Sequence, residues 1–393
     1  MLQFPFPKVL PILNQLNDHG YDAYVVGGAV RNAMLGLPIH DIDITTSATP
    51  DIVQNLFQKT VPVGIEHGTV LVIYQGEGYE VTTFRSESEY SDFRHPNHVT
   101  FVSSIQEDLK RRDFTMNAMA IDKEGVLIDP YEGKKDCQLK QIRMVGNPLD
   151  RIHEDPLRLL RGLRFLSQLD FSLGRHERQA FNETSPLLSK VSIERVSQEM
   201  TKLLHGQAVS KALQYLVETN CHKHLLLCEN KGEDILSHSK RKLIVLQSDA
   251  EHWCAFLMAL QIDVQEFCSK WKMSSSLRKA MIKLKSVFQE QAQKPWDVYS
   301  LYQSGLEQAL AIERLNYVFY SHYSMQDQRI HQLWKKMPIH HRQDVSVTGH
   351  DLIKWLNKKS GPWIAHKLEQ IEKRILSGQL INRREDIKQW LLQ

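Results

Sequence analysis

Residues 23–46 read AYVVGGAVRNAMLGLPIHDIDITT, and this stretch decides the fold of the first part of the chain. AYVV and DIDIT are short and rich in β-branched residues, so they predict strands. Between them, Gly27 and Gly28 precede a helical pattern, where backbone N–H groups and the helix dipole favour an anion. Arg31, one turn further on, is placed to hold the same anion. The stretch therefore predicts a phosphate site.

Asp41 and Asp43 predict a metal site beside it. Residues i and i+2 of a strand point to one face, so the two carboxylates should converge while Ile42 packs inward. Two such carboxylates repel each other unless a cation lies between them, and Mg²⁺ prefers carboxylate and phosphate oxygens. An ordinary Gly-Gly turn and a surface Asp pair are the alternative for each feature alone. Their ordered combination within 17 residues favours a nucleotide site.

Segments further along the chain also predict mixed α/β structure for the first part. TVLVIYQG, YEVTTFR and VTFV predict more strands, with helical patterns between them. In RRDFTMNAMA, Arg111 and Arg112 precede an expected apolar helix with Asp113 as its N-cap. The arginines either hold a triphosphate or are solvated.

The pattern of apolar and polar residues changes after Asn147-Pro148. From Pro156 onward, apolar residues recur at three- and four-residue spacing, which predicts an all-helical remainder. Within it, residues 153–164 read HEDPLRLLRGLR, with polar residues at every third position. We expect these to form a stripe on one face of a single helix, opposite the leucines. Alone, the stripe is typical of a solvated basic face: Asp155, Arg158, Arg161 and Arg164.

Composition narrows the class of protein. Of 393 residues, 42% are hydrophobic and 24% charged, which is ordinary for a globular protein and suggests two or three folded units. The apolar runs fall short of the roughly 18–20 residues that span a bilayer. The N-terminus does not have the pattern of a signal peptide, and five cysteines are too irregularly spaced for a disulfide framework. We therefore expect a cytoplasmic protein.

Charge is distributed unevenly. The net charge of +3 speaks against a nucleic-acid partner when taken over the whole chain. Residues 321–393, however, hold 13 Lys+Arg against 7 Asp+Glu, a net of +6, so residues 1–320 carry −3. Because phosphate attraction depends on where positive charge lies, the last segment is a candidate nucleic-acid surface.

Three motifs together resemble a known family. GGAVRNAMLG…DIDITTSATP, RRDFTMNAMA and EDPLRLLRGLRF, in this order and spacing, are similar to the class II tRNA nucleotidyltransferase/poly(A) polymerase family. The C-terminal stretch from TGHDLIKW to DIKQWL resembles its CCA-adding members of the Bacillus type, and the similarity covers essentially the whole chain. The resemblance implies an α+β fold, in which a nucleotidyltransferase-like mixed head with a small β-sheet precedes an elongated all-α part. The implied division is head 1–147, neck 148–207, body 208–320 and basic, tRNA-binding tail 321–393.

The resemblance also implies an activity. It is the addition of C, C and A to the 3′ end of tRNA from CTP and ATP, without a nucleic-acid template. Asp41 and Asp43 are then the catalytic residues and bind two Mg²⁺ ions, whereas Gly28, Arg31 and Arg112 contact the nucleotide. Glu80, in YEVTTFR, is either a third carboxylate of the site or a structural partner. Relatives further suggest a homodimer.

Asp155 and Arg158 match the family's protein template, whose logic follows from base chemistry. Cytosine and adenine present an amine donor beside a ring-nitrogen acceptor, and uracil and guanine present the reverse. A carboxylate beside a guanidinium therefore pairs with C or A, and each mismatch with U or G costs roughly 1–3 kcal/mol. Arg161 and Arg164 would contact the base or the phosphates.

Other activities share such a head, namely CC-only or A-only addition and bacterial poly(A) polymerisation. Residues 83–94, TFRSESEYSDFR, match a flexible loop that CC-adding relatives lack, and no strongly basic extension of the poly(A) polymerase kind follows Gln393. Both features favour complete CCA addition. A non-catalytic RNA-binding protein would be expected to have lost Asp41 or Asp43. Asn32 departs from the Asp that the family commonly carries after Arg31.

Overall fold

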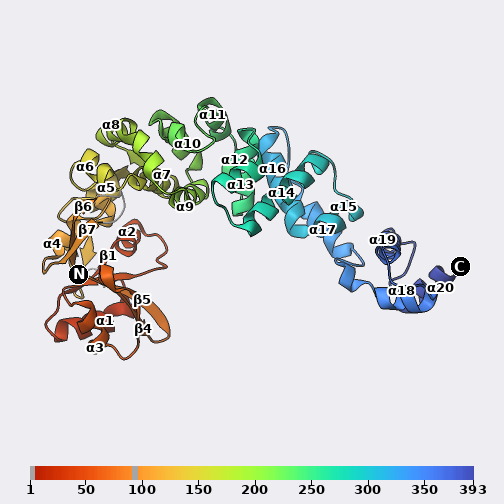
Figure 1. Cartoon of the computed structure of the whole chain (residues 1–393), viewed down its shortest axis with the longest axis horizontal. Helices are drawn as coiled ribbons and strands as arrows, with labels where there is room; N and C mark the ends of the chain where they lie inside the picture. The colour runs from red at the N-terminus through yellow and green to blue at the C-terminus, as the bar shows by residue number, and fades with distance from the viewer. Residues whose placement is uncertain (1–4, 91–95) are drawn as a thin grey trace. The chain divides into compact units, whose positions relative to one another are not determined.

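The computed structural model describes residues 5–90 and 96–393. The chain forms two compact units, Met1–Lys240 with Ser269–Lys272, and Arg241–Cys268 with Met273–Gln393. Figure 1 colours the elements along the chain. Residues 91–95, at the end of the predicted flexible loop, lie outside the described residues. The four-part division into head, neck, body and tail stays a prediction.

The first unit begins with a mixed sheet (Figure 1). Its strands within the described residues are β1 (Ala23–Val26), β2 (Asp43–Thr46), β3 (Thr60–Gly64), β4 (Thr69–Tyr74), β5 (Glu77–Thr83), β8 (Ala120–Ile121) and β9 (Leu127–Ile128). Their order across the sheet is β3-β4-β5-β2-β1-β8-β9. Separate pairs are β6 (Arg85–Tyr90) with β7 (Pro96–Phe101) and β10 (Gln141–Ile142) with β11 (Ser172–Leu173). The expected strands are confirmed, whereas β3, β6 and the short strands β8 to β11 were not expected. β6 lies within residues 83–94, which were expected to form a flexible loop.

The register of this sheet gathers polar residues at one edge. β1 and β2 are antiparallel, with Val26 opposite Asp43. β2 and β5 are parallel, and the residues that follow Asp43 and Glu80 are paired, so these two acids lie side by side. The turn at Gly27, at the end of β1, therefore lies next to Asp43 at the start of β2, and Glu80 lies beside Asp43 in the middle of β5.

Helices flank the sheet and then make up most of the chain, so the α+β fold is confirmed. Those of the first unit are α1 (Leu10–Asp18), α2 (Gly28–Leu35), α3 (Pro50–Leu56), α4 (Ile105–Lys110), α5 (Gly133–Leu139), α6 (Pro148–Glu154), α7 (Leu157–Leu169), α8 (Arg175–Thr184), α9 (Ile193–Leu204), α10 (Val209–Glu218) and α11 (Gly232–Ser239). The leucines of α7 are buried, and this helix packs against α9 and α10. The amphipathic pattern of α7 thus determines how this helix packs, and α7 is the helix that was expected to carry base-reading residues.

The second unit is helical. It contains α12 (Asp249–Ala259), α13 (Val264–Lys270, whose last residues belong to the first unit), α14 (Ser275–Gln291), α15 (Val298–Ser304), α16 (Leu306–Phe319), α17 (Asp327–Lys336), α18 (Gly349–Leu356), α19 (Trp363–Leu376) and α20 (Arg384–Leu392). A buried apolar cluster that includes Ile339, Leu352, Ile371 and Ile387 joins the last three helices. In the part of the chain that the structure describes, no helix has both the length and the apolar character of a membrane span.

Two local predictions are wrong. Asp113 does not cap a helix, because the following residues form a bridge at Phe114, a 3-10 turn at Thr115–Asn117 and then β8. Asp155 does not lie on the helix of the three arginines. α6 ends at Glu154, Asp155 is extended with φ −145°, and Pro156 precedes the first residue of α7. Proline disfavours the helical conformation in the residue before it, which accounts for this break.

Candidate active site

Gly27 lets the chain turn sharply between β1 and α2. Its φ is +70°, a conformation that side chains other than glycine rarely adopt. A Cβ atom here would lie 3.1 Å from Nη1 of Arg112 and 3.8 Å from Oδ2 of Asp43. The Gly-Gly pair thus brings an arginine, a carboxylate and the N-terminus of α2 together around one backbone turn, as the sequence predicted.

Asp41, Asp43 and Glu80, which we call the carboxylate edge, line one pocket of ≈ 410 Å³. Asp43 is the first residue of β2, and Asp41 lies two residues before it. The pKa of Asp43 is raised, first by burial of the carboxyl group and then by repulsion from Glu80, while Arg112 opposes the shift and Asp41 adds to it. The predicted convergence of acids is therefore present, and Glu80 belongs to it.

The carboxylate edge fits a divalent cation by its chemistry. Carboxylate oxygens are preferred ligands of Mg²⁺, and a cation would relieve the repulsion that raises the pKa of Asp43. Among the described residues, no three or more His, Cys, Asp or Glu side chains form a complete metal-binding cluster. A cation at this edge would therefore need further oxygen ligands, such as those of a phosphate.

Asp108 holds the two arginines of the RRD motif. Its side chain is fully buried, and it pairs with Nε of Arg111 at 2.9 Å and Nη2 of Arg112 at 3.2 Å. Burial alone would raise the pKa of Asp108, but the two guanidinium groups outweigh it and hold the pKa below its usual value. Nε of Arg112 is buried without a hydrogen-bond partner. Arg112 therefore has one unpaired, buried donor, and its Nη1 lies against the Gly27 turn.

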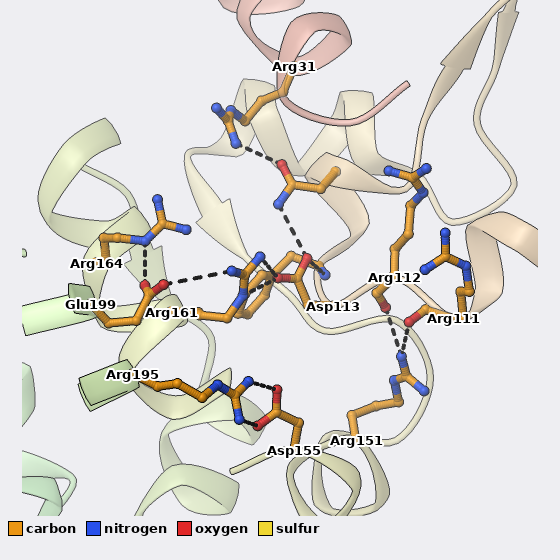
Figure 2. A network of polar contacts seen from close by, with 12 residues as sticks. Arg31, Arg111, Arg112, Asp113, Arg151, Asp155, Arg161, Arg164, Arg195 and Glu199 are labelled. Carbon is orange, nitrogen blue, oxygen red and sulfur yellow. Dashed lines mark hydrogen bonds and ion pairs between the residues drawn. The ribbon is translucent and has the colours of Figure 1, made fainter. Parts of the chain in front are cut away.

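Arg31 reaches from α2 toward α7. Its Nη1 donates to Oδ1 of Asn117 at 2.7 Å, and Nδ2 of Asn117 donates to Oδ1 of Asp113 at 3.3 Å (Figure 2). Asn32 accepts from Nε and Nη2 of Arg31 at 3.2 and 2.9 Å, and donates to the carbonyl of Pro38. An amide can accept and donate at the same time, whereas an ionised Asp at this position could only accept, so Asn32 is suited to its position.

Asp113 pairs with the second arginine of α7 instead of capping a helix. Nη2 and Nε of Arg161 lie 2.7 and 2.8 Å from Oδ2 of Asp113. Burial would raise the pKa of Asp113, but Arg161 outweighs it and lowers the pKa to about 2. On the other side, Arg164 binds Glu199 of α9 at 2.6 Å (Figure 2). We call these linked residues the arginine network: Arg31, Asn117, Asp113, Arg161, Arg164 and Glu199.

Phe165 lies within the arginine network. The guanidinium carbon of Arg164 is 3.9 Å from the centre of its ring, that of Arg31 is 5.1 Å away and that of Arg161 is 5.8 Å away. Burial, followed by repulsion from Arg164, lowers the pKa of Arg31 to about 10. Three cations therefore lie around one aromatic ring, which suits a polyanionic ligand.

Asp155 and Arg158 are held by different partners. Asp155 accepts from Nη1 and Nη2 of Arg195 in α9 at 3.2 and 2.7 Å. Nη1 of Arg158 donates to Oε2 of Glu154 and to the carbonyl of Arg151, both at 2.6 Å. The proposed template groups thus come from the α6–α7 junction, where two sets of neighbours orient them.

Several residues of the site were not found from the sequence. Asp108 stands three and four residues before the arginines it binds, a helical spacing that could have indicated the pair. Arg195 and Glu199 lie on an ordinary amphipathic helix that carried no distinguishing signal. The structure places most of the predicted site residues around two centres: Asp41 and Asp43 at the carboxylate edge, and Arg31, Arg161 and Arg164 in the arginine network, which Asp155 and Arg158 adjoin.

Comparison with known proteins gives a consistent result along the whole chain. Residues 23–143 match a family model for the poly A polymerase head domain, residues 170–228 one for a probable RNA and SrmB-binding site of polymerase A, and residues 244–391 one for a putative tRNA nucleotidyltransferase domain 2. The chain is 43% identical over 388 residues to a CCA-adding enzyme of Bacillus mycoides (strain KBAB4), with 98% of each chain covered. A CCA-adding enzyme of Bacillus cereus (strain B4264) is 42% identical, with the same coverage.

Solved structures agree. A crystal structure of the Bacillus stearothermophilus CCA-adding enzyme in complex with CTP has a TM-score of 0.89 and 36% identity, covering 100% of this chain and 98% of that one. A tRNA nucleotidyltransferase complexed with a primer tRNA and an incoming ATP analogue has a TM-score of 0.60 and 24% identity, covering 84% of this chain and 98% of that one. The second likeness shows a shared fold.

Proposed function

The chain belongs to the family of CCA-adding enzymes, and from that premise we propose that it adds C, C and A to the 3′ end of tRNA from CTP and ATP. The relatives that carry this activity in their names match it over 98% of its length, and the similar Bacillus stearothermophilus structure is a complex with CTP. The observation that carries the proposal is a carboxylate edge beside a buried, paired set of arginines in one compact unit.

We assign Asp41 and Asp43 as the catalytic residues and metal ligands. The 3′-oxygen of tRNA attacks the α-phosphorus, a new P–O bond forms, and the bond to the leaving pyrophosphate breaks. When bound, Mg²⁺ would make the 3′-hydroxyl more acidic and stabilise the charge that develops on the phosphates. Glu80 supports this role, because its repulsion of Asp43 disfavours the site without a cation. The choice of Mg²⁺ over other divalent cations is part of the proposal.

Arg112, Arg31 and the backbone at Gly28 are the proposed phosphate contacts. Arg112 has a buried Nε with a donor to offer, and it lies against the Gly27 turn. Arg31 is a buried cation whose pKa is lowered to about 10, so an anionic ligand would stabilise it. These groups would orient the triphosphate so that its α-phosphorus meets the carboxylate edge.

Asp155 and Arg158 are the proposed base-reading groups. Oδ1 of Asp155 accepts from Arg195 and from the backbone N–H of Leu157, and Oδ2 accepts from Arg195. A carboxylate has about four acceptor sites, so Asp155 can still accept from an exocyclic amine. Arg158 uses Nη1 for Glu154 and the Arg151 carbonyl, and a guanidinium has five N–H donors. Asp155 and Arg158 together can therefore form hydrogen bonds with C or A, and they disfavour U or G, whose donor and acceptor are reversed. Arg161 and Arg164 would attract the phosphates or the base from α7.

The head, neck, body and tail boundaries at 147, 207 and 320 are part of the same proposal. So is tRNA binding by the basic tail, which holds +6 of charge over residues 321–393. A cytoplasmic location and a homodimer stay predictions.

Product sequencing tests the function. The protein is given CTP, ATP and Mg²⁺ with tRNAs that lack one, two or all three of the terminal C, C and A nucleotides. Growth that stops after CCA supports the proposal. Growth that ends at CC, addition of A alone, or a lengthening A-tail would assign the chain to a CC-adding enzyme, an A-adding enzyme or a poly(A) polymerase.

A further inference from the structure

Arg151 connects the two parts of the proposed nucleotide site. It lies in α6, and its Nη2 donates to the carbonyls of Arg111 and of Arg112, the latter at 3.1 Å (Figure 2). Its Nη1 pairs with Oε2 of Glu154 at 2.5 Å. One guanidinium thus holds both the backbone that carries Arg112 and the acid that orients Arg158.

We propose that Arg151 is a positioning residue that couples the base-reading groups at the α6–α7 junction to the phosphate-binding Arg112. The inference rests on the proposed function, because it assigns no new ligand. Through Arg151, recognition of the base affects the binding of the phosphates by Arg112. Arg151 itself is not placed in contact with substrate.

The connection is short and largely buried. The side chain of Arg158 is 8% exposed, that of Arg151 is 13% exposed and that of Glu154 is 27% exposed. Arg158 donates to the Arg151 carbonyl and to Glu154, so its position depends on both the backbone and the side-chain partner of Arg151. A planar guanidinium with both ends engaged has little rotational freedom, so displacement at one end is transmitted to the other.

Charge explains how Arg158 can be released toward a base. Arg151 and Arg158 share the single carboxylate of Glu154. When Arg158 turns toward a base, Glu154 keeps its pair with Arg151 and is not left as an uncompensated buried anion. The movement of Arg158 then changes the contacts of Arg151. Through its two carbonyl contacts, Arg151 passes this change on to the peptide that carries Arg112.

Arg241 provides a matched control. Its Nη1 donates to two successive carbonyls, those of Val318 and Phe319, at 3.3 and 3.4 Å. The chemistry is that of Arg151, but Arg241 lies in the second compact unit. Arg241→Met should therefore report the general cost of losing such a bridge.

The test compares wild type, Arg151→Met, Arg151→Lys and Arg241→Met in the full chain. Two quantities are measured with Mg²⁺ present: the ratio of kcat/KM for CTP over UTP, and the Kd of inorganic tripolyphosphate, which has no base. In Arg151→Met, both the ratio and the affinity for tripolyphosphate should fall by roughly 3- to 30-fold. Arg151→Lys keeps a cation for Glu154 but lacks the planar fork, so it should fold normally and still show both defects.

Each outcome decides between explanations. A purely structural role would lower the melting temperature and the active fraction and leave the CTP/UTP ratio unchanged, as expected for Arg241→Met. Wild-type values of both quantities in Arg151→Lys, or a change in the ratio alone, would overturn the coupling. If Arg151→Met does not fold, the Arg151→Lys result decides. A wild-type protein that adds no nucleotide would instead contradict the proposed function itself.

Discussion

The carboxylate edge and the arginine network hold charge in opposite ways. Burial raises the pKa of Asp43, and its acidic neighbours Glu80 and Asp41 add to the shift. Burial would do the same to Asp113, but Arg161 outweighs it and brings the pKa to about 2. Two carboxylates in the same unit therefore differ because Asp43 has two acidic neighbours that add to the effect of burial while Arg112 only partly opposes it, whereas Asp113 is directly paired with Arg161.

The difference shows which part of the site is complete before substrate arrives. The arginine network pairs Arg161 with Asp113 and Arg164 with Glu199 before any substrate binds, so its side chains are preorganised. The carboxylate edge keeps an electrostatic repulsion that Arg112 offsets in part and that a bound cation would relieve further. We therefore expect metal to control chemistry, and the arginines with the template groups to control binding and base choice. The following changes test that division.

The largest effect is expected from the carboxylate edge. Asp41→Ala or Asp43→Ala should lower incorporation of both CTP and ATP by at least ~10⁴-fold, because each removes a proposed metal ligand. Binding of tRNA should change little. Single-turnover extension of radiolabelled tRNA measures the loss, with Asp51→Ala, an exposed acid of α3, as the control. Retained turnover in either variant would refute the assignment.

Asp108→Asn should damage the phosphate-binding side. Removing one partner of a buried ion pair costs about 3–5 kcal/mol, since Arg111 and Arg112 lose their shared anion. Urea unfolding measures this cost, and the KM for CTP should rise at the same time. Asp136→Asn is the matched control, because Asp136 is buried and pairs with Arg143 elsewhere in the head. It should lose stability without a change in KM, and equal KM values in both variants would contradict the assigned role.

Asp113 should make the stability of the protein depend on pH. Its folded pKa of about 2 lies below the ordinary value. The ionised pair therefore stabilises the folded state above about pH 4 by about 2–3 kcal/mol, and this contribution is lost as pH falls through about 2. The difference in unfolding free energy between wild type and Asp113→Asn should shrink between pH 7 and pH 3. A difference that stays constant over this range would show that Arg161 does not lower the pKa.

Base choice should respond to Asp155. In Asp155→Ala, the preference for CTP over UTP should fall by about 1–3 kcal/mol, since the acceptor for the exocyclic amine is lost. Competition kinetics with both nucleotides measure the ratio, and the exposed Asp150 of α6 gives the control variant Asp150→Ala. A variant that discriminates as well as wild type would exclude Asp155 from the template.

The sequence was sufficient where the site depends on neighbours along the chain. The Gly27 turn, the strand with Asp43 and the amphipathic helix α7 follow from local patterns, and the structure contains all three. The Asp108 pairs could also have been predicted from their spacing of three and four residues.

The predictions from the sequence were wrong at two residues whose conformation depends on a partner that is distant along the chain. Asp113 was expected to cap a helix because nothing local indicates Arg161, 48 residues away. Asp155 was expected on one helix with Arg158, whereas Pro156 ends the continuity and Arg195, 40 residues away, binds the carboxylate. Tertiary pairing in these two places outweighs local helix signals, and both lie in the proposed active site.

Nucleotide binding without metal tests the central division most directly. Calorimetric titration with CTP and UTP is performed in EDTA and again with Mg²⁺, and extension of tRNA is followed in both. We predict that CTP binds more tightly than UTP in EDTA while no extension occurs, and that Mg²⁺ restores extension. Loss of the CTP preference in EDTA would contradict the account, because base choice would then depend on the carboxylate edge and its metal.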